Sequence, residues 1–198
     1  PYSVTVDQPK VPIVRNGTLR LKVRAQRKDG YEKKITVRFP WIPPGISTPA
    51  TMTFNEKDTE LEYELNANEN AEINSWNLTV LAESDGGTGI SYNASPFIKL
   101  SVEEPFVQMK MSMATAKQGE TADMVAEVEH LRDFGGEAEV QLFGLPAYST
   151  AAAQKLKGGV DGLSFPIATT DKTPVGQHKG VFCTVTVVKD GEPIVHRL

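Results

Sequence analysis

The amino-acid sequence carries one pattern of turns and apolar runs twice. Tyr31 and Phe134 are 103 positions apart, and so are the pairs Val37 and Val140, and Pro43 and Pro146. A repeat of this length is too long for one unit of a solenoid and suits a whole small domain. The sequence therefore predicts two tandem copies of one module.

Length and composition allow two small globular domains and argue against several classes of partner. The chain has 198 residues and a formal net charge of −4. No basic run is interleaved with aromatic residues, which argues against a nucleic-acid partner. No stretch has the roughly 20 consecutive apolar residues of a membrane span. The chain opens on Pro1 and shows no signal peptide, so we expect an excised segment of a longer protein.

Alternation of apolar and polar residues dominates the chain and predicts an all-β fold. It is clearest over residues 18–27, 59–65 and 76–83, and only residues 151–157 offer a helical turn. Further strands are expected near residues 3–6, 34–39, 97–102, 106–113, 121–129, 137–142, 160–167, 179–188 and 193–198. Short strands with frequent turns are typical of an immunoglobulin-like β-sandwich. We predict two tandem sandwiches, residues 1–102 and 103–198, joined at Glu103-Glu104-Pro105.

Several segments of the two copies occur in the same order. The second copy carries QGE, DFGGEAEVQLFGLP, TPVGQHKGVFCTVTV and GEP, and the first carries RNGTLRLKV, DGYEKKITVRFPWIPPGI and ENAEINSWNLTVLAES. In these segments the chain resembles the bacterial Ig-like domains arrayed in large secreted and surface proteins. The Cys…Trp…Cys pattern of antibody domains is missing. The resemblance implies a spacer, stalk or adhesion module that is extracellular, periplasmic or on the cell surface.

The residues able to carry catalysis form no recognisable motif. His130, His178 and His196 have no Ser, Cys or acid at a catalytic spacing. We therefore expect surface or strand-end histidines and a protein that is not an enzyme, with no metal and no cofactor. The single cysteine, Cys183, alternates with two valines, which predicts a buried strand residue.

Two strands of the first copy carry opposite charges on their polar faces. The charged side chains stand at alternate positions, and they are Arg20, Lys22, Arg24, Glu60, Glu62 and Glu64. The acidic row by itself suggests a cation or substrate face. In an Ig-like sandwich, however, the second and fifth strands are antiparallel neighbours in one sheet. We therefore predict an exposed cross-strand charge ladder, with the residues between the charges facing the core.

Aromatic residues are the candidates for ligand binding. Trp76 alternates in phase with buried positions, which predicts a core residue, whereas Trp41 lies in a proline-rich loop where the second copy has Gly144. An exposed tryptophan there caps its own sandwich, contacts a neighbouring domain or stacks on a sugar ring. Tyr31 and Tyr148 are weaker candidates to accompany it.

The second copy ends before the counterpart of the first copy's last strand, residues 97–102. We expect residues 193–198 to serve as its last strand through the tight hairpin at residues 189–192. Ile194–His196 should then pair antiparallel with Val185–Val187. The alternative is an open sheet edge that recruits another chain.

These features favour a non-catalytic spacer of a larger secreted or surface protein, with protein–protein contacts as a further role. One alternative is a carbohydrate-binding module, which needs two or three exposed aromatic rings in one row. Another is an accessory domain of a secreted hydrolase whose active site lies outside this segment.

Overall fold

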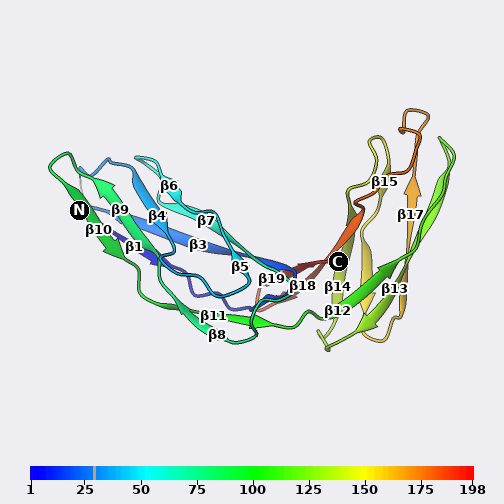
Figure 1. Ribbon diagram of the computed structural model, residues 1–198, viewed down its shortest axis with the longest axis horizontal. Coiled ribbons are helices and arrows are strands. Elements are labelled where there is room, and N and C mark those ends of the chain that lie inside the picture. Colours follow the sequence, from blue (N-terminus) through cyan, green and yellow to red (C-terminus); the bar gives the residue numbers. More distant parts are fainter. Residues whose placement is uncertain (29) are drawn as a thin grey trace. The chain divides into compact units, whose positions relative to one another are not determined.

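The computed structural model describes residues 1–28 and 30–198, and these residues form strands and loops without any helix (Figure 1). The chain divides into two compact units, Pro1–Glu103 and Glu104–Leu198. Asp29, the first residue of the segment DGYEKKITVRFPWIPPGI, lies outside the described residues.

Unit 1 contains two four-stranded antiparallel sheets and a further group of three paired strands. Its strands are β1 (Tyr2–Val6), β2 (Ile13–Val14), β3 (Gly17–Arg27), β4 (Ile35–Arg38), β5 (Ile46–Ser47), β6 (Met52–Phe54), β7 (Glu60–Ala67), β8 (Ser75–Leu78), β9 (Leu81–Asp85), β10 (Ile90–Ala94) and β11 (Ile98–Glu103). The sheet orders are β1-β3-β7-β5 and β10-β9-β4-β6. β11 pairs antiparallel with β8 and parallel with β2.

Unit 2 repeats the two four-stranded sheets in the same order. Its strands are β12 (Val107–Met111), β13 (Thr121–His130), β14 (Glu137–Phe143), β15 (Thr150–Ala151), β16 (Gln154–Lys157), β17 (Gly162–Ala168), β18 (Phe182–Lys189) and β19 (Glu192–Arg197). The sheet orders are β12-β13-β17-β15 and β19-β18-β14-β16. The turn before β3 recurs before β13, because Asn16 and Gly119 both have positive φ, 56° and 81°.

Each unit buries the apolar side chains of alternating strand positions. Val23, Tyr63 and Val37 are fully buried in unit 1, and Val140 and Phe165 are fully buried in unit 2. These residues come from both sheets of their unit, so each unit has its own core. The prediction that Cys183 is buried in a strand is confirmed.

Two local predictions need correction. The segment 151–157 forms part of β15 and all of β16 instead of a helical turn, because β16 pairs with β14 and Lys155 and Lys157 each lie 3.1 Å from a Glu137 carboxylate oxygen. Tertiary pairing here outweighs the local helix preference. Trp76 is half-buried at the surface instead of lying in the core, although its strand neighbours Leu78 and Val80 are buried as expected.

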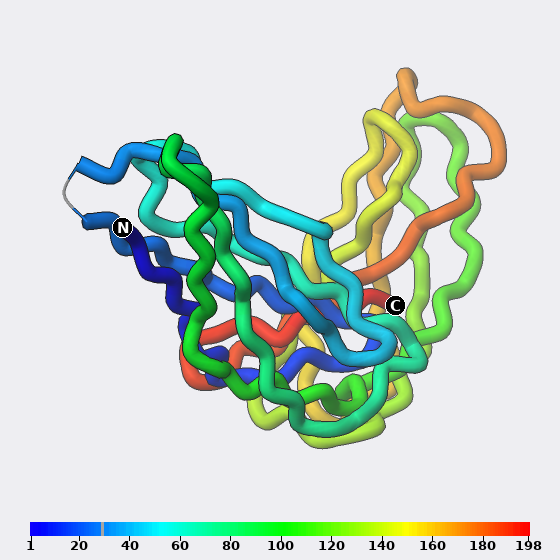
Figure 2. The backbone as a smooth tube through the Cα atoms, turned by 60° about the vertical axis from the view of Figure 1, so that its left-hand side comes forward, coloured from blue at the N-terminus to red at the C-terminus, as the bar shows by residue number. Residues whose placement is uncertain are grey.

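The predicted pairing of the second copy's C-terminal segment is confirmed, but β19 takes the place of β10 and not that of β11, the first copy's last strand. Val185 lies opposite His196 and Val187 lies opposite Ile194 in an antiparallel pair. The hairpin turn has positive φ at Asp190 and Gly191, 50° and 79°, which matches the twist of the flanking strands. Figure 2 shows this hairpin in red at the end of the chain.

The predicted charge ladder on β3 and β7 is also confirmed. Arg20, Lys22 and Arg24 lie directly opposite Glu64, Glu62 and Glu60 in the antiparallel register. The shortest ion pairs are Arg24 to Glu60 at 3.0 Å and Arg20 to Glu64 at 3.3 Å. Arg24 also binds Asp7 on the other side, and this hydrogen bond lowers the pKa of the Asp7 carboxyl.

Unit 2 has no such ladder at the equivalent strand pair. Asp123 lies opposite Pro166, Val125 opposite Ser164, and Glu127 opposite Gly162. The fold therefore forms without the charge ladder, which contributes register and surface charge to unit 1 only.

Reversing the acidic row to lysine should lower the melting temperature of unit 1 by a few degrees at low salt. Opposed like charges on neighbouring strands destabilise a sheet, and salt screens exposed charges, so the loss should shrink at about 1 M NaCl. The measurement is differential scanning calorimetry of the triple variant Glu60→Lys, Glu62→Lys and Glu64→Lys.

A matched control makes the same change of net charge away from the ladder. It replaces three exposed acids of the same unit, Glu32, Glu69 and Glu72. Equal losses in the two variants, or a loss that ignores salt, would show that the ladder has no specific effect.

Candidate functional sites

Trp41 and Trp76 form the aromatic cluster that the sequence singled out. Trp41 is 51 % exposed, and the centres of the two rings are 5.6 Å apart at an interplanar angle of 56°. Trp76 lies on β8, opposite Leu100 on β11. The Trp76 indole N–H is buried and has no hydrogen-bond partner among the described residues. Trp41 thus covers part of Trp76 and leaves half of its own surface in solvent.

The two tyrosines named with Trp41 lie in different settings. The Tyr31 hydroxyl donates to Ser84 Oγ at 2.6 Å, and its ring lies 5.7 Å from that of Tyr2. Tyr148 is exposed in unit 2 and has a φ of 60°. Within the described part of the chain, no ring contact joins either tyrosine to Trp41.

The backbone explains why unit 2 does not repeat Trp41. Gly144 has a φ of 73°, and a Cβ built there would collide with the carbonyl oxygen of Gly180. A tryptophan at this position would need a shift of the loop, so the aromatic cluster belongs to unit 1 alone.

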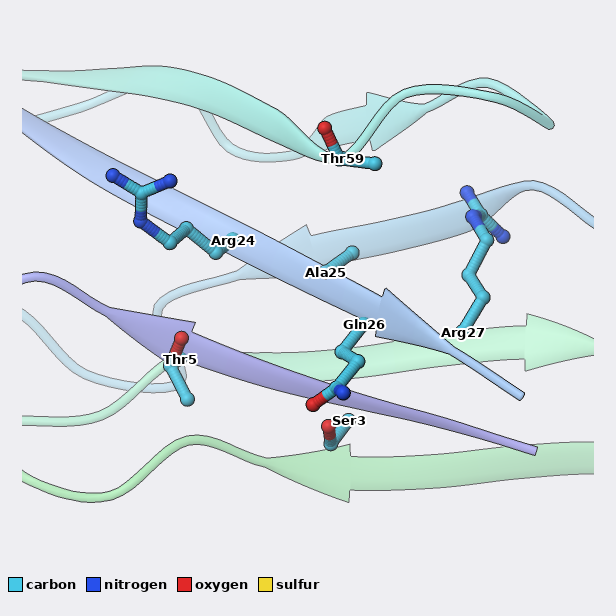
Figure 3. Close-up of a pocket in the computed structure, with 7 residues that line it drawn as sticks. All are labelled: Ser3, Thr5, Arg24, Ala25, Gln26, Arg27 and Thr59. Atoms are coloured by element: carbon cyan, nitrogen blue, oxygen red, sulfur yellow. The ribbon is translucent and has the colours of Figure 1, made fainter. Parts of the chain in front are cut away.

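A shallow depression of about 490 Å³ lies on β1 and β3 (Figure 3). Its lining residues are Ser3, Thr5, Arg24, Ala25, Gln26, Arg27 and Thr59. Both guanidinium groups are already bound: Arg24 holds two carboxylates, and Arg27 donates to the carbonyl oxygens of Lys33 and Asn55 at 2.5 and 2.6 Å. The depression therefore presents hydroxyl and amide groups to solvent rather than free positive charge.

Two histidines and the single cysteine, residue types that often carry catalysis, are engaged in hydrogen bonds or buried. His130 Nε2 lies 2.8 Å from the Val160 carbonyl oxygen, and His178 Nε2 lies 2.8 Å from that of Pro174. Burial raises the pKa of the Cys183 thiol to about 11, so the thiolate nucleophile is strongly disfavoured.

His196 is a buried residue that sequence reasoning placed at the surface or a strand end. It does stand near the end of β19, but it is only 2 % exposed, and neither ring nitrogen has a hydrogen-bond partner among the described residues. Burial, with a smaller effect of the nearby Arg132 charge, lowers its pKa from 6.5 to about 4. Alternation with the buried Ile194 was the signal that could have predicted this position.

Unit 2 also carries an aromatic pair that the sequence did not predict. Phe143 on β14 lies opposite Phe182 on β18, and their rings stack at 5.6 Å and 20°. The Arg197 guanidinium lies 3.6 Å from the centre of the Phe182 ring. The arginine covers one face of this pair, which makes the cluster a cross-strand packing contact.

The described residues contain neither a His, Cys, Asp or Glu cluster for a metal ion nor a membrane-spanning helix. No group of three or more His, Cys, Asp or Glu side chains there is arranged to hold a metal ion. No helix in the same residues is long and apolar enough to span a bilayer.

Comparisons with known proteins give low similarity. No protein-family model matches the sequence, and no curated protein matches it. A crystal structure of a protein of unknown function from Porphyromonas gingivalis W83 is 13 % identical, with all of this chain and 98 % of that chain covered and a TM-score of 0.36. The D0-D1 domain of intimin is 11 % identical, with 99 % and 96 % covered and a TM-score of 0.33.

The buried His196 should make unit 2 less stable in acid. Its pKa is about 4 in the folded chain and near 6.5 when exposed, so the unfolded chain binds the extra proton as the pH falls from 6.5 towards 4. The free energy of unfolding therefore falls over that range, and the loss reaches about 3 kcal/mol at pH 4. Urea unfolding of wild type and His196→Leu at pH 7 and pH 4.5 measures this.

The free energy of unfolding of His196→Leu should fall less between pH 7 and pH 4.5 than that of wild type, whatever its value at pH 7. Val187→Ala, which shortens another buried side chain of unit 2 without removing a titratable group, should keep the pH dependence of wild type. Parallel pH profiles for wild type and His196→Leu would refute the assignment.

Proposed function

We propose that this chain is a tandem pair of immunoglobulin-like sandwiches that acts as a non-catalytic structural module of a secreted or cell-surface bacterial protein. Its role is to hold other parts of that protein, or of a partner, at a fixed separation. Protein–protein contacts are a secondary role of its exposed edges.

The observation that carries this proposal is that the two units share a strand order but not their surface features. The order β1-β3-β7-β5 facing β10-β9-β4 corresponds to the A-B-E-D and G-F-C sheets of an Ig-like fold. The charge ladder and the tryptophan cluster occur in unit 1, and the Phe143–Phe182 stack occurs in unit 2. The repeated property is thus the scaffold itself, which favours a structural role over a repeated binding site.

The groups available for catalysis support the same proposal. Cys183 and His196 are core residues with pKa values shifted towards their uncharged forms, to about 11 and about 4. His130 and His178 each bind a backbone carbonyl. These side chains are therefore engaged in core packing or in contacts with backbone carbonyls.

Unit 1 has a feature that suits it to bear tension. β2, near its N-terminus, pairs parallel with β11, at its C-terminus, and Arg15 N–H donates to Glu103 O at 3.0 Å. Tension on the two ends pulls these parallel strands past each other along their length. The hydrogen bonds between them are then loaded together rather than one after another, which resists extension.

Single-molecule force spectroscopy should show two separate unfolding events. Each should lengthen the chain by about 30 nm, since each unit has roughly 100 residues of ~0.36 nm extended length. Unit 1 should unfold at the higher force, because the β2–β11 pair has no counterpart among the described residues of unit 2. A single merged event, or equal forces for the two units, would contradict this proposal.

The contribution of the β2–β11 pair can be isolated at Arg15. Arg15→Pro removes the N–H that binds Glu103 O and should lower the higher unfolding force. Arg15→Ala removes the side chain but keeps this N–H, so the unfolding force of unit 1 should stay close to that of wild type. Equal losses in both variants would assign the effect to the side chain, which binds the Ala71 carbonyl.

A second function, carbohydrate binding, is favoured by one observation: Trp41 is half exposed beside a second indole ring. A sugar ring could stack on such a surface. A glycan array probed with the whole chain tests it. Binding that Trp41→Ala abolishes, and that Phe97→Ala at another exposed aromatic leaves intact, would support this function, whereas an empty array would reject it.

A further inference from the structure

Sulfur-bearing side chains gather in one part of the unit 2 core. Every methionine except Met52 lies in unit 2, and so does the single cysteine. Four of these side chains occupy inward positions on β12, β13 and β18, and we call them the sulfur cluster: Met109, Met111, Met124 and Cys183. Strand alternation places the three methionines on the face that also carries the buried Ala126 and Val128.

The same positions of unit 1 carry only hydrocarbon side chains. The register of β1 on β3 matches that of β12 on β13, so Val4 and Met109 hold equivalent places. The four unit 1 counterparts of the sulfur cluster are all buried, and they are Val4, Val6, Leu21 and Val80. Valine and leucine thus suffice to pack this part of the core, so packing alone does not require sulfur at all four positions.

Two of the sulfur atoms lie close together across the core. Cys183 Sγ on β18 lies 3.6 Å from Met109 Sδ on β12, and these strands belong to opposite sheets of unit 2. Two sulfur atoms that bind one ion in a trigonal arrangement, at about 2.3 Å each, stand about 4 Å apart. The separation of this pair is therefore already close to that of two ligands of one ion.

A third sulfur atom is available beside this pair. Met111 lies two residues beyond Met109 on the same face of β12, opposite the small side chain of Ala126. Met124 is diagonal to Met111 across the β12–β13 pair. The unbranched thioether side chain of methionine has three rotatable bonds and turns readily towards a neighbour. Met111 can therefore bring its sulfur atom to an ion held by the other two.

The ligand types of the sulfur cluster select a soft monovalent cation. Thioether and thiolate sulfur favour Cu(I) over hard cations such as Mg²⁺ and Ca²⁺. Burial raises the pKa of the Cys183 thiol to about 11, because the core solvates a thiolate charge poorly. A monovalent cation offsets this cost, since its charge and that of the thiolate sum to zero. The thiol proton leaves to solvent as the metal–sulfur bond forms.

From this arrangement we propose that Cys183, Met109 and Met111 form a binding site for Cu(I) inside unit 2. One ion binds the Cys183 thiolate and two neutral thioethers, and one proton is released. The expectation of no metal rested on histidine and carboxylate patterns, which do not report thioether ligands. The site goes beyond the proposed structural role and does not depend on it.

Titration of the whole chain with Ag(I), a redox-stable substitute for Cu(I), tests this proposal. In chloride-free buffer at pH 7, isothermal titration calorimetry should show one ion bound per chain. Repeating the titration in buffers of different protonation enthalpy should show one proton released per ion. The methyl NMR signals of Met109 and Met111 should shift on binding, and that of Met52 in unit 1 should not.

Substitutions taken from unit 1 remove the ligands and keep an aliphatic core. Cys183→Val and Met109→Val should each weaken Ag(I) binding by about 100-fold or more, because losing even an indirect partner of a metal ligand costs about 10–100-fold. Cys183→Val should also abolish the proton release. Met109→Leu keeps the volume of methionine and should weaken binding equally, which separates loss of the ligand from a packing defect. Met52→Leu is the matched control and should bind as wild type.

Three results would overturn the proposal. No Ag(I) binding at micromolar concentration would show that the sulfur cluster serves packing alone. Binding without proton release, or binding unchanged by Cys183→Val, would assign the ion to thioethers elsewhere in the chain. Binding abolished by Met113→Leu, at the exposed methionine after β12, would place the ion at the surface.

Discussion

Strand β11 is the element on which the difference between the two units depends. Its backbone pairs on both sides, antiparallel with β8 and parallel with β2, and its alternate side chains Ile98, Leu100 and Val102 are buried. One strand thus satisfies the polar backbone of two neighbours and covers one end of the core. Where unit 2 has no such strand, the counterpart of β8 is a loop and nearby core positions are half exposed.

The remaining architecture tolerates wide variation in surface chemistry. Three cation–anion pairs cross from β3 to β7, whereas the matching strands of unit 2 place proline, serine and glycine opposite their neighbours. Both pairs of strands nonetheless keep an antiparallel register with buried residues between. Burial of one face sets the register, because a shift by one residue would expose every core side chain. The charges reinforce that register in unit 1.

Buried polar residues show how the cores constrain chemistry. Cys183 and His196 both face inward from the sheet that contains β18 and β19, and both have pKa values shifted towards their uncharged forms. A low-dielectric environment disfavours the charged form of each group. Residues that would be reactive in a cleft are therefore held in their uncharged forms here, and sugar binding, as we propose it, falls to an exposed aromatic ring instead.

The sequence predicted the long strands well because their signal is local. Alternation over residues 18–27 and 59–65 identified β3 and β7 and the opposition of their charges, and the turn at residues 189–192 identified the final hairpin. The short strands β2, β5, β6, β10, β15 and β16 were missed, and residues 76–83, expected as one strand, are divided between β8 and β9, which pair with different neighbours. Two to five residues are too few to show a period, and such strands form because a neighbour supplies hydrogen bonds.

For the candidate site, the sequence determined that Trp41 is not part of the repeat, and the tertiary structure decided what surrounds it. Its contact with Trp76 joins residues 35 positions apart, and a side chain at Gly144 is excluded by the carbonyl oxygen of Gly180, 36 positions further along the chain. The burial of His196 is likewise a tertiary outcome. Periodicity reports which way a side chain points, but packing between distant segments decides whether anything covers it.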